Sequence, residues 1–286
     1  MIIYKNYDKA ALDSQYNNRA RVPNFEQIVQ RWETESEQLR QRVKSYRGVS
    51  YGSRAREYLD IFPAAHPGAP LQVFFHGGYW QALQSGVFHF ITNGFLRHGI
   101  TTVFVNYPLA PEASMDEIVE ACRQAIIWLY RHAAEYGGNP NQIYISGHSA
   151  GGHLAAMLMA TYWKTLAEEL PHNLIKGGCA ISGLFNLIPI QLSYVNDKIG
   201  LDKAAAQRNS PAFLTPASSS PLIVSVGGAE SEEYHAQSQE LTAAWSQHGL
   251  SITELILEGR HHFSILDSLV DPEGALNRAI LGQMGV

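Results

Sequence analysis

Apolar positions along the chain alternate between two periods, which predict strands and helices in turn. Short runs of consecutive apolar residues are typical of strands buried on both faces of a sheet. The helical segments between them repeat apolar residues every three or four positions. The predicted strands are 71–75, 100–107, 142–146, 176–182, 221–228 and 252–259, and the predicted helices are 85–97, 114–136, 150–166, 232–248 and 263–281. This alternation predicts a mostly parallel sheet with helices on both faces, an α/β domain.

Two parts of the chain depart from this alternation. Residues 1–46 are rich in charge, and sparse apolar positions within 24–43 predict a helix lying on a larger body. Residues 51–62 predict one or two strands. Residues 184–216 have no clean period and contain several prolines, which is typical of a lid, a cap or a pocket wall. We therefore expect one domain, 1–286, with an N-terminal helical extension and a cap-like insertion.

Composition narrows the function classes. Hydrophobic residues make up 45% and charged residues 16% of the 286 residues, which argues against disorder. The formal net charge is −5 and no basic stripe is present, so we expect no nucleic-acid partner. No apolar run approaches a membrane span, and the N-terminus lacks a signal-peptide core, so we expect no membrane partner. Cys122 and Cys179 form no disulfide framework and fit a reducing cytoplasm.

The segment Ile145 to Gly152, ISGHSAGG, contains a Gly-x-Ser-x-Gly motif between a predicted strand and a predicted apolar helix. This context is typical of a nucleophile elbow, in which a sharp turn exposes a serine hydroxyl above the sheet. Gly147 and Gly151 leave room for neighbouring backbone, and Ser149 is the candidate nucleophile. The alternative is a glycine-containing turn with an inert serine.

A second motif, His76-Gly77-Gly78-Tyr79-Trp80, follows the predicted strand 71–75. Such a loop supplies backbone amides to an oxyanion hole opposite the elbow. The predicted donors are the N–H groups of Gly78, Tyr79 and Ala150. Taken alone, the motif also fits a glycine turn covered by core aromatic residues.

A serine hydrolase also needs an acid and a histidine, in that chain order. The acid belongs after strand 221–228, where Glu230, Glu232 and Glu233 are candidates. Glu230 is nearest the strand end, whereas Glu232 and Glu233 are expected to face solvent on the first helical turn. The histidine belongs after strand 252–259, where His261 and His262 are adjacent.

An adjacent histidine pair also raises the question of a metal site. The sequence contains no His-Glu-x-x-His motif and no further ligand cluster at metal spacing. We therefore expect neither a metal nor another cofactor.

With these motifs in place, the whole chain resembles the α/β-hydrolase superfamily. It is most similar to the arylformamidase (kynurenine formamidase) branch, near the hormone-sensitive-lipase-like esterases. The resemblance lies in HGGYW, where those esterases usually carry a third glycine in place of Tyr79, in Ser182 to Pro211, in ESEEYHAQSQ (Glu230 to Gln239) and in the N-terminal LDSQYNNRARVPNF. It implies that Glu230 is the catalytic acid and that His262, directly before Phe263, is the base. The family often has Asp at the position of Glu230.

The resemblance implies hydrolysis of N-formyl-L-kynurenine to L-kynurenine and formate, in tryptophan catabolism. The partner would be a small-molecule substrate with an aromatic leaving group. Aromatic residues that would line its pocket are Tyr79, Trp80, Phe185 and Tyr194. The resemblance leaves a homodimer open.

Two other functions remain as alternatives. A carboxylesterase or amidase acting on short acyl groups shares every motif and the same chemistry. A catalytically inactive binding module on the same fold would be expected to lose Ser149, His262 or the oxyanion glycine, and all three are present.

Overall fold

The computed structural model describes residues 1–286, which form one eight-stranded sheet, one small two-stranded sheet and the helices around them. The strands are β1 (Ile2–Tyr4), β2 (Tyr7–Asp8), β3 (Tyr46–Ser50), β4 (Tyr58–Phe62), β5 (Ala69–Phe75), β6 (Thr101–Val105), β7 (Gly138–His148), β8 (Ile175–Ile181), β9 (Leu222–Gly227) and β10 (Ile252–Leu257).

The α-helices are α1 (Lys9–Tyr16), α2 (Asn18–Arg21), α3 (Phe25–Arg42), α4 (Met115–His132), α5 (Ala150–Met159), α6 (Ile188–Leu192), α7 (Asn196–Ile199), α8 (Lys203–Arg208), α9 (Glu232–Ser246) and α10 (Ala275–Met284). The 3₁₀ turns are η1 (Ser85–Val87), η2 (His89–Gly94), η3 (Leu96–His98), η4 (Ala133–Tyr136), η5 (Trp163–Thr165), η6 (Pro211–Phe213) and η7 (Ser264–Leu269).

The large sheet has the order β10-β9-β8-β7-β5-β6-β4-β3. Strands β5 to β10 are parallel, and β3 and β4 form an antiparallel edge. After β5 the chain continues to β6 on one side and later to β7 on the other. Ligands of open parallel sheets bind beyond the carboxyl ends of the strands at such a switch of direction. The loop after β5 and the turn after β7 therefore emerge side by side.

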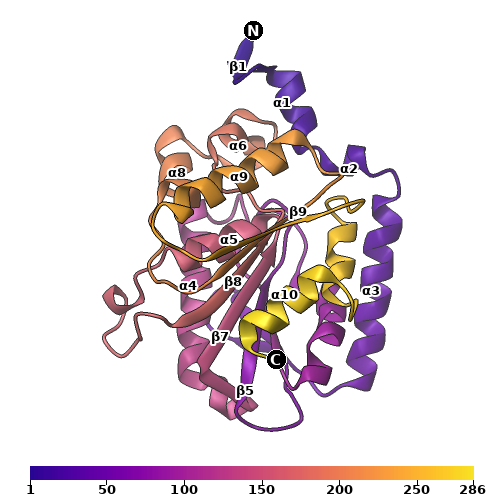
Figure 1. Cartoon of the computed structure of the whole chain (residues 1–286), viewed down its shortest axis with the longest axis vertical. Helices are drawn as coiled ribbons and strands as arrows, with labels where there is room; N and C mark the ends of the chain where they lie inside the picture. The colour runs from indigo at the N-terminus through magenta and orange to yellow at the C-terminus, as the bar shows by residue number, and fades with distance from the viewer.

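The sheet separates two apolar cores. Along β5, Val73 and Phe75 belong to the core on one face, and Phe74 belongs to the core on the other, as the two-residue period of a strand requires. Helices α4, α5 and α9 cover the first face, and α3 and α10 cover the second (Figure 1). The predicted mostly parallel sheet with helices on both faces is confirmed.

Several predicted helices are shorter than their apolar patterns suggested. Segment 85–97 forms the 3₁₀ turns η1 to η3 and no α-helix, because it contains two glycines and several β-branched and aromatic residues with low helix propensity. Segment 263–281 divides into η7 and α10 around Pro272 and Gly274. Segment 150–166 is helical only to Met159 before η5. Within 51–62 only β4 is a strand, and β1, β2, β3, α1 and α2 were not predicted.

The N-terminal segment and residues 184–216 meet above the sheet. Residues 184–216 contain α6, α7, α8 and η6, and these lie with α9 and α2 at the upper end of the sheet in Figure 1. The two segments are hydrogen-bonded directly, because the Tyr194 N–H donates to Asp13 Oδ1 at 2.7 Å. None of the helices has the length and apolar content that crossing a lipid bilayer requires.

Candidate active site

Ser149 stands at a strained turn between β7 and α5. Its φ of 58° and ψ of −119° lie in a region that non-glycine residues rarely adopt. The Ser149 N–H donates to the Ile181 carbonyl at 2.8 Å, which fixes the turn to β8. A Cβ at Gly151 would lie 1.9 Å from the Phe75 carbonyl oxygen, and one at Gly147 would lie 2.0 Å from the Gly151 oxygen. Both glycines of the motif are therefore required by backbone packing.

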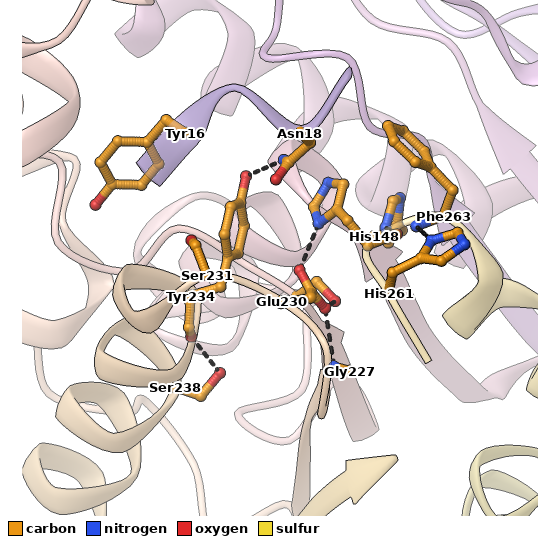
Figure 2. A network of polar contacts seen from close by, with 12 residues as sticks. Tyr16, Asn18, His148, Gly227, Glu230, Ser231, Tyr234, Ser238, His261 and Phe263 are labelled. Atoms are coloured by element: carbon orange, nitrogen blue, oxygen red, sulfur yellow. Dashed lines mark hydrogen bonds and ion pairs between the residues drawn. The ribbon is translucent and has the colours of Figure 1, made fainter. Parts of the chain in front are cut away.

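His262 is paired with a buried carboxylate. Glu230 Oε2 lies 2.6 Å from His262 Nδ1, and the side chains are 0% and 6% exposed respectively. The other oxygen, Oε1, accepts a hydrogen bond from Ser182 Oγ at 2.5 Å. It also accepts one from the Gly227 N–H at 2.8 Å (Figure 2). A carboxylate at Nδ1 keeps the proton on that nitrogen and leaves Nε2 available as a base.

His148 is a second imidazole beside His262. The two ring centroids are 4.6 Å apart, and His148 Nε2 donates to the His262 carbonyl oxygen at 2.7 Å. Burial, with a smaller contribution from the charge of His262, lowers the pKa of His148 well below its usual value. His148 is therefore neutral, and it anchors the backbone of His262 without repelling a positive charge on the neighbouring ring.

The loop after β5 lies directly against Ser149. A Cβ at Gly77 would come within 3.1 Å of the Ser149 Cβ. Gly78 has a φ of +110°, and Tyr79 and Trp80 continue with positive φ values of 50° and 56°. The N–H groups of Gly78 and Tyr79 donate to no protein acceptor. The Ala150 N–H is the first of α5 and has no partner within the helix. These three amides are the donors that an oxyanion would need.

A network of hydroxyl groups holds Tyr79 in place. Tyr79 donates its one hydroxyl proton to the Tyr16 carbonyl at 2.6 Å, so its contact with the Tyr234 hydroxyl at 2.9 Å uses the proton of Tyr234. Asn18 Nδ2 donates to the same Tyr234 hydroxyl at 2.8 Å (Figure 2). Burial raises the pKa of Tyr234, against hydrogen bonds with Tyr79, Asn18 and Ser149 that lower it, so its proton is retained. The Tyr234 ring also packs on His262, with ring centroids 4.7 Å apart.

Ser149 and His262 open onto one cavity of about 370 Å³. Their side chains make no direct hydrogen bond in this structure, and such contacts often tighten when substrate binds. The walls come from the N-terminal segment, α3, the loop after β5, and the chain around α7. The lining residues are Asn17, Asn18, Arg19, Phe25, Val29, Trp32, Gly77, Gly78, Tyr79, Gln81, Ala82, Leu83, Phe88, His148, Ser149, Tyr194, Val195, Lys198, His262 and Phe263.

Comparisons with known proteins place this chain in a family of hydrolases. A family model described as BD-FAE matches residues 59–245. A kynurenine formamidase from Danio rerio is 33% identical over 257 residues, which cover 87% of this chain and 85% of that protein. The chain belongs to the kynurenine formamidase family. A more distant kynurenine formamidase, from Drosophila melanogaster, is 23% identical over 80% of this chain and 78% of its own.

Solved structures agree with this family assignment at the level of the fold. A Silicibacter protein proposed to be a thioesterase superposes with a TM-score of 0.83 at 30% identity, covering 94% of this chain and 98% of that one. A thermostable carboxylesterase from a metagenomic library has a TM-score of 0.72 at 18% identity, covering 91% and 95%. The fold is that of the α/β-hydrolases, as predicted, and the family consists of hydrolases.

Two of the aromatic residues predicted to line the substrate pocket do not line the cavity of this member of the kynurenine formamidase family. Trp80 and Phe185 are both 0% exposed. Trp80 packs edge-on against His153, with ring centroids 4.9 Å apart, and Phe185 lies in the core, where its N–H donates to Gln237 Oε1. These two predictions are wrong because both side chains point into the apolar core. Tyr79 and Tyr194 do line the cavity.

The candidates that the sequence left open occupy different places. Glu232 is exposed at the start of α9, as predicted. Glu233, predicted to face solvent, is only 2% exposed and bonds Lys5 Nζ at 2.9 Å and the Tyr16 hydroxyl at 3.1 Å. This prediction was wrong because the N-terminal segment covers the first turn of α9. His261 lies outside the cavity, and its Nδ1 accepts the N–H groups that begin η7.

Three polar residues of the site were not predicted. Asn18 donates a hydrogen bond to the Tyr234 hydroxyl, and Ser182 donates one to the Glu230 carboxylate. Tyr234 is hydrogen-bonded to the Tyr79 hydroxyl. Each contact joins segments far apart in the chain, so no local spacing could indicate it. The only available signal was that all three residues lie inside stretches that resemble the family.

Proposed function

We propose that this protein is an arylformamidase that hydrolyses N-formyl-L-kynurenine to L-kynurenine and formate, with Ser149, Glu230 and His262 as its catalytic triad. The observation that carries the proposal is the convergence of Ser149 and the buried His262–Glu230 pair on one cavity. The family supplies the substrate, because kynurenine formamidases match 87% of this chain at 33% identity.

In the first half of the reaction, Ser149 Oγ attacks the formyl carbon while His262 Nε2 takes its proton. Glu230 stabilises the imidazolium that forms. The amides of Gly78, Tyr79 and Ala150 hold the tetrahedral oxyanion, and losing one such donor typically costs about 2.7–4 kcal/mol of barrier. His262 then protonates the departing arylamine nitrogen, the C–N bond breaks, and L-kynurenine leaves a formyl ester on Ser149.

In the second half, water replaces the amine. His262 removes a proton from the water as its oxygen attacks the formyl ester, and the same three amides hold the second oxyanion. His262 returns that proton to Ser149 Oγ as formate leaves. These reaction steps use only water and the side chains and backbone groups of the chain. We therefore propose that no metal or organic cofactor takes part.

The second candidate function is a carboxylesterase acting on short acyl esters. It is favoured by the esterase folds among the structural neighbours, such as the carboxylesterase at TM-score 0.72, although 18% identity speaks only for the fold. The two functions share the proposed triad and oxyanion hole. They differ in which leaving group the cavity accepts.

A direct comparison of substrates tests the proposal. We expect kcat/KM for N-formyl-L-kynurenine to exceed that for p-nitrophenyl acetate and p-nitrophenyl butyrate by at least 10-fold. Ser149→Ala should remove all three activities with an unchanged circular dichroism spectrum. Efficient ester hydrolysis without turnover of the formamide would reject the formamidase in favour of the esterase.

We further propose that the enzyme works in the cytoplasm, in the degradation of tryptophan. Cys122 and Cys179 are both buried and free, which fits a reducing compartment. The product L-kynurenine is the chemical link to tryptophan. Fractionation of cells expressing the tagged chain tests the location.

A further inference from the structure

The cavity that contains Ser149 has an electrostatic character opposite to that of the whole molecule. The chain has 26 Asp and Glu against 21 Lys and Arg. None of the 20 residues that line the cavity is Asp or Glu, whereas Arg19 and Lys198 both line it. Both cations are exposed, while Ser149 and His262 are only 3% and 5% exposed. The positive charges therefore lie at the rim and the proposed nucleophile lies at the base.

An aromatic ring holds the Arg19 guanidinium in place, and no carboxylate pairs with its charge. The guanidinium stacks over the ring of Phe25, 4.9 Å from the ring centroid, and no carboxylate lies within ion-pair distance of it. No protein acceptor takes a hydrogen bond from its N–H groups. A guanidinium stacked on an aromatic face keeps its edge free, and that edge matches the two oxygens of a carboxylate.

Lys198 projects from α7, in the other segment that covers the site. Its only hydrogen bond is a long one, 3.4 Å, to the Gln81 carbonyl oxygen, and it forms no ion pair. Asp13, an acidic residue of the N-terminal segment, is already bonded to Lys9 at 2.8 Å and to the Tyr194 N–H at 2.7 Å. Neither rim cation forms an ion pair with the protein.

We propose that Arg19 and Lys198 form a carboxylate-binding subsite at the cavity rim, so that the preferred substrates are small aryl amides or esters whose leaving group carries a carboxylate. The inference rests on the proposed function in one respect: a formyl group carries no substituent, so the anion must belong to the amine that leaves. For N-formyl-L-kynurenine this anion is the α-carboxylate. The N-terminal segment and α7 would then select the substrate, while the sheet supplies the reacting groups.

Paired substrates with and without a carboxylate test the subsite. The amide pair is N-formyl-L-kynurenine, a zwitterion, and its carboxamide, and the ester pair is 4-acetoxybenzoate and phenyl acetate. Arg19→Gln and Lys198→Gln should each raise KM for the carboxylate member of a pair about 10-fold, and the double variant about 100-fold, with kcat nearly unchanged. Turnover of the members without a carboxylate should change less than twofold. Arg19→Lys keeps the charge but lacks the pair of N–H donors with which a guanidinium binds both carboxylate oxygens. Its affinity should therefore lie between those of the wild type and Arg19→Gln.

A matched control removes a charge from the same covering segment outside the cavity. Lys203 is exposed at the start of α8 and does not line the cavity, so Lys203→Gln should leave all four substrates unaffected. Equal losses for the members with and without a carboxylate, or no loss for the carboxylate members, would overturn the subsite.

The two pairs separate this inference from the formamidase assignment. If the wild-type chain hydrolyses only esters, the formamidase proposal fails, and the ester pair still decides whether the rim selects anions. If the formamides are turned over but the double variant treats the members with and without a carboxylate alike, the subsite fails and the formamidase remains. Binding of L-kynurenine to Ser149→Ala, measured by calorimetry with and without the two rim substitutions, gives the same answer without turnover. Unchanged affinity would overturn the subsite.

Discussion

Glu230 uses its two carboxylate oxygens for different purposes. Oε2 faces His262 Nδ1, while Oε1 is held by Ser182 Oγ and the Gly227 N–H. Three hydrogen-bonding groups therefore fix a side chain that is completely shielded from water. The family often has Asp here, and the longer glutamate still reaches the imidazole because both ends of its carboxylate are anchored.

Glu230→Gln tests the acid assignment. The amide keeps the size but removes the charge that stabilises the imidazolium, and it can present an N–H to Nδ1 and favour the wrong tautomer. We expect kcat to fall about 10³–10⁴-fold, as for the equivalent change in other triads. Steady-state kinetics on N-formyl-L-kynurenine, or on the better ester if the formamide is inert, measures the loss. A fully active variant would contradict the assignment.

Tyr79 combines a strained backbone with an anchored side chain. Its φ is 50°, and its hydroxyl is bonded to the Tyr16 carbonyl and the Tyr234 hydroxyl. The tyrosine at this glycine position of related esterases thus ties the oxyanion loop to the N-terminal segment. Its ring lines the cavity as well, so its hydroxyl and its bulk have separate effects.

Tyr79→Phe separates these two effects. Phenylalanine keeps the ring but leaves the Tyr16 carbonyl without its partner, which typically costs about 1–3 kcal/mol for a buried group. We expect a lower melting temperature and a roughly 10-fold lower kcat, because the loop amides are placed less accurately, with KM within threefold. Tyr194→Phe is the comparison, since the Tyr194 hydroxyl reaches the same carbonyl only at 3.4 Å. Identical kinetics in Tyr79→Phe and the wild type would show that the hydroxyl does not position the loop.

At the scale of elements, the N-terminal segment is part of the active-site architecture. It covers the first turn of α9, where Glu233 bonds Lys5 and Tyr16, and Ser231 Oγ donates to the Gln15 carbonyl at 2.7 Å. Tyr16 and Leu12 of α1 are fully buried in the same core as α4 and α5. An extension that the charge pattern predicted to lie on the surface therefore supplies part of a cavity wall.

Glu233→Gln should loosen this segment more than Glu232→Gln. Glu233 is buried and has two partners, whereas Glu232 is exposed and bonds only the Tyr7 hydroxyl at 3.1 Å. We expect Glu233→Gln to lower the unfolding free energy by about 1–3 kcal/mol, the usual range for a disturbed buried hydrogen bond. Trypsin should also cleave at Arg19 and Arg21 sooner. Glu232→Gln should match the wild type in both assays, and equal behaviour of the two variants would contradict this reading of the segment.

The sequence predicted those elements and residues whose signals are local. The elbow around Ser149, the loop after β5 and the parallel strands each depend on spacing within a few residues, and the structure places them as expected. Asn18, Ser182 and the burial of Glu233 depend on segments that meet only in the folded chain. Of the four aromatic residues predicted for the substrate pocket, Trp80 and Phe185 failed for the same reason, because an aromatic residue in an irregular segment fits a core or a cavity equally well.

For the whole molecule, the switch of direction between β5 and β7 explains why the proposed catalytic groups gather at one end of the sheet. The two strands are neighbours, so the oxyanion loop and Ser149 emerge together, and β8 and β9 on the same side bring Ser182 and Glu230. The 3₁₀ turn η7 follows β10 and begins directly after His262 and Phe263. His76, His148 and His153 are buried in this part of the molecule. Their burial makes the stability of the fold depend on pH.

Three buried histidines that have no carboxylate partner should make the protein labile to mild acid. Burial lowers the pKa of His76 to about 3 and of His153 to about 4, and it lowers that of His148 well below its usual value. Because their pKa values are near 6.5 in the unfolded chain, the unfolded state binds more protons below that pH, and stability falls as the pH falls. Between pH 7 and pH 5 each histidine should cost about 2 kcal/mol of unfolding free energy.

Urea unfolding at pH 7, 6 and 5, followed by tryptophan fluorescence, measures this dependence, and His153→Gln isolates one of the three contributions. Glutamine can still donate to the Asn209 carbonyl, which His153 Nε2 contacts at 2.7 Å, but it does not titrate. The variant should be less stable at pH 7, because its side chain fills the space against Trp80 less well. Its stability should nevertheless decline by about 2 kcal/mol less than that of the wild type between pH 7 and pH 5. An unchanged slope would show that His153 is not neutral in the folded state, because only a histidine that stays unprotonated on folding contributes to the decline.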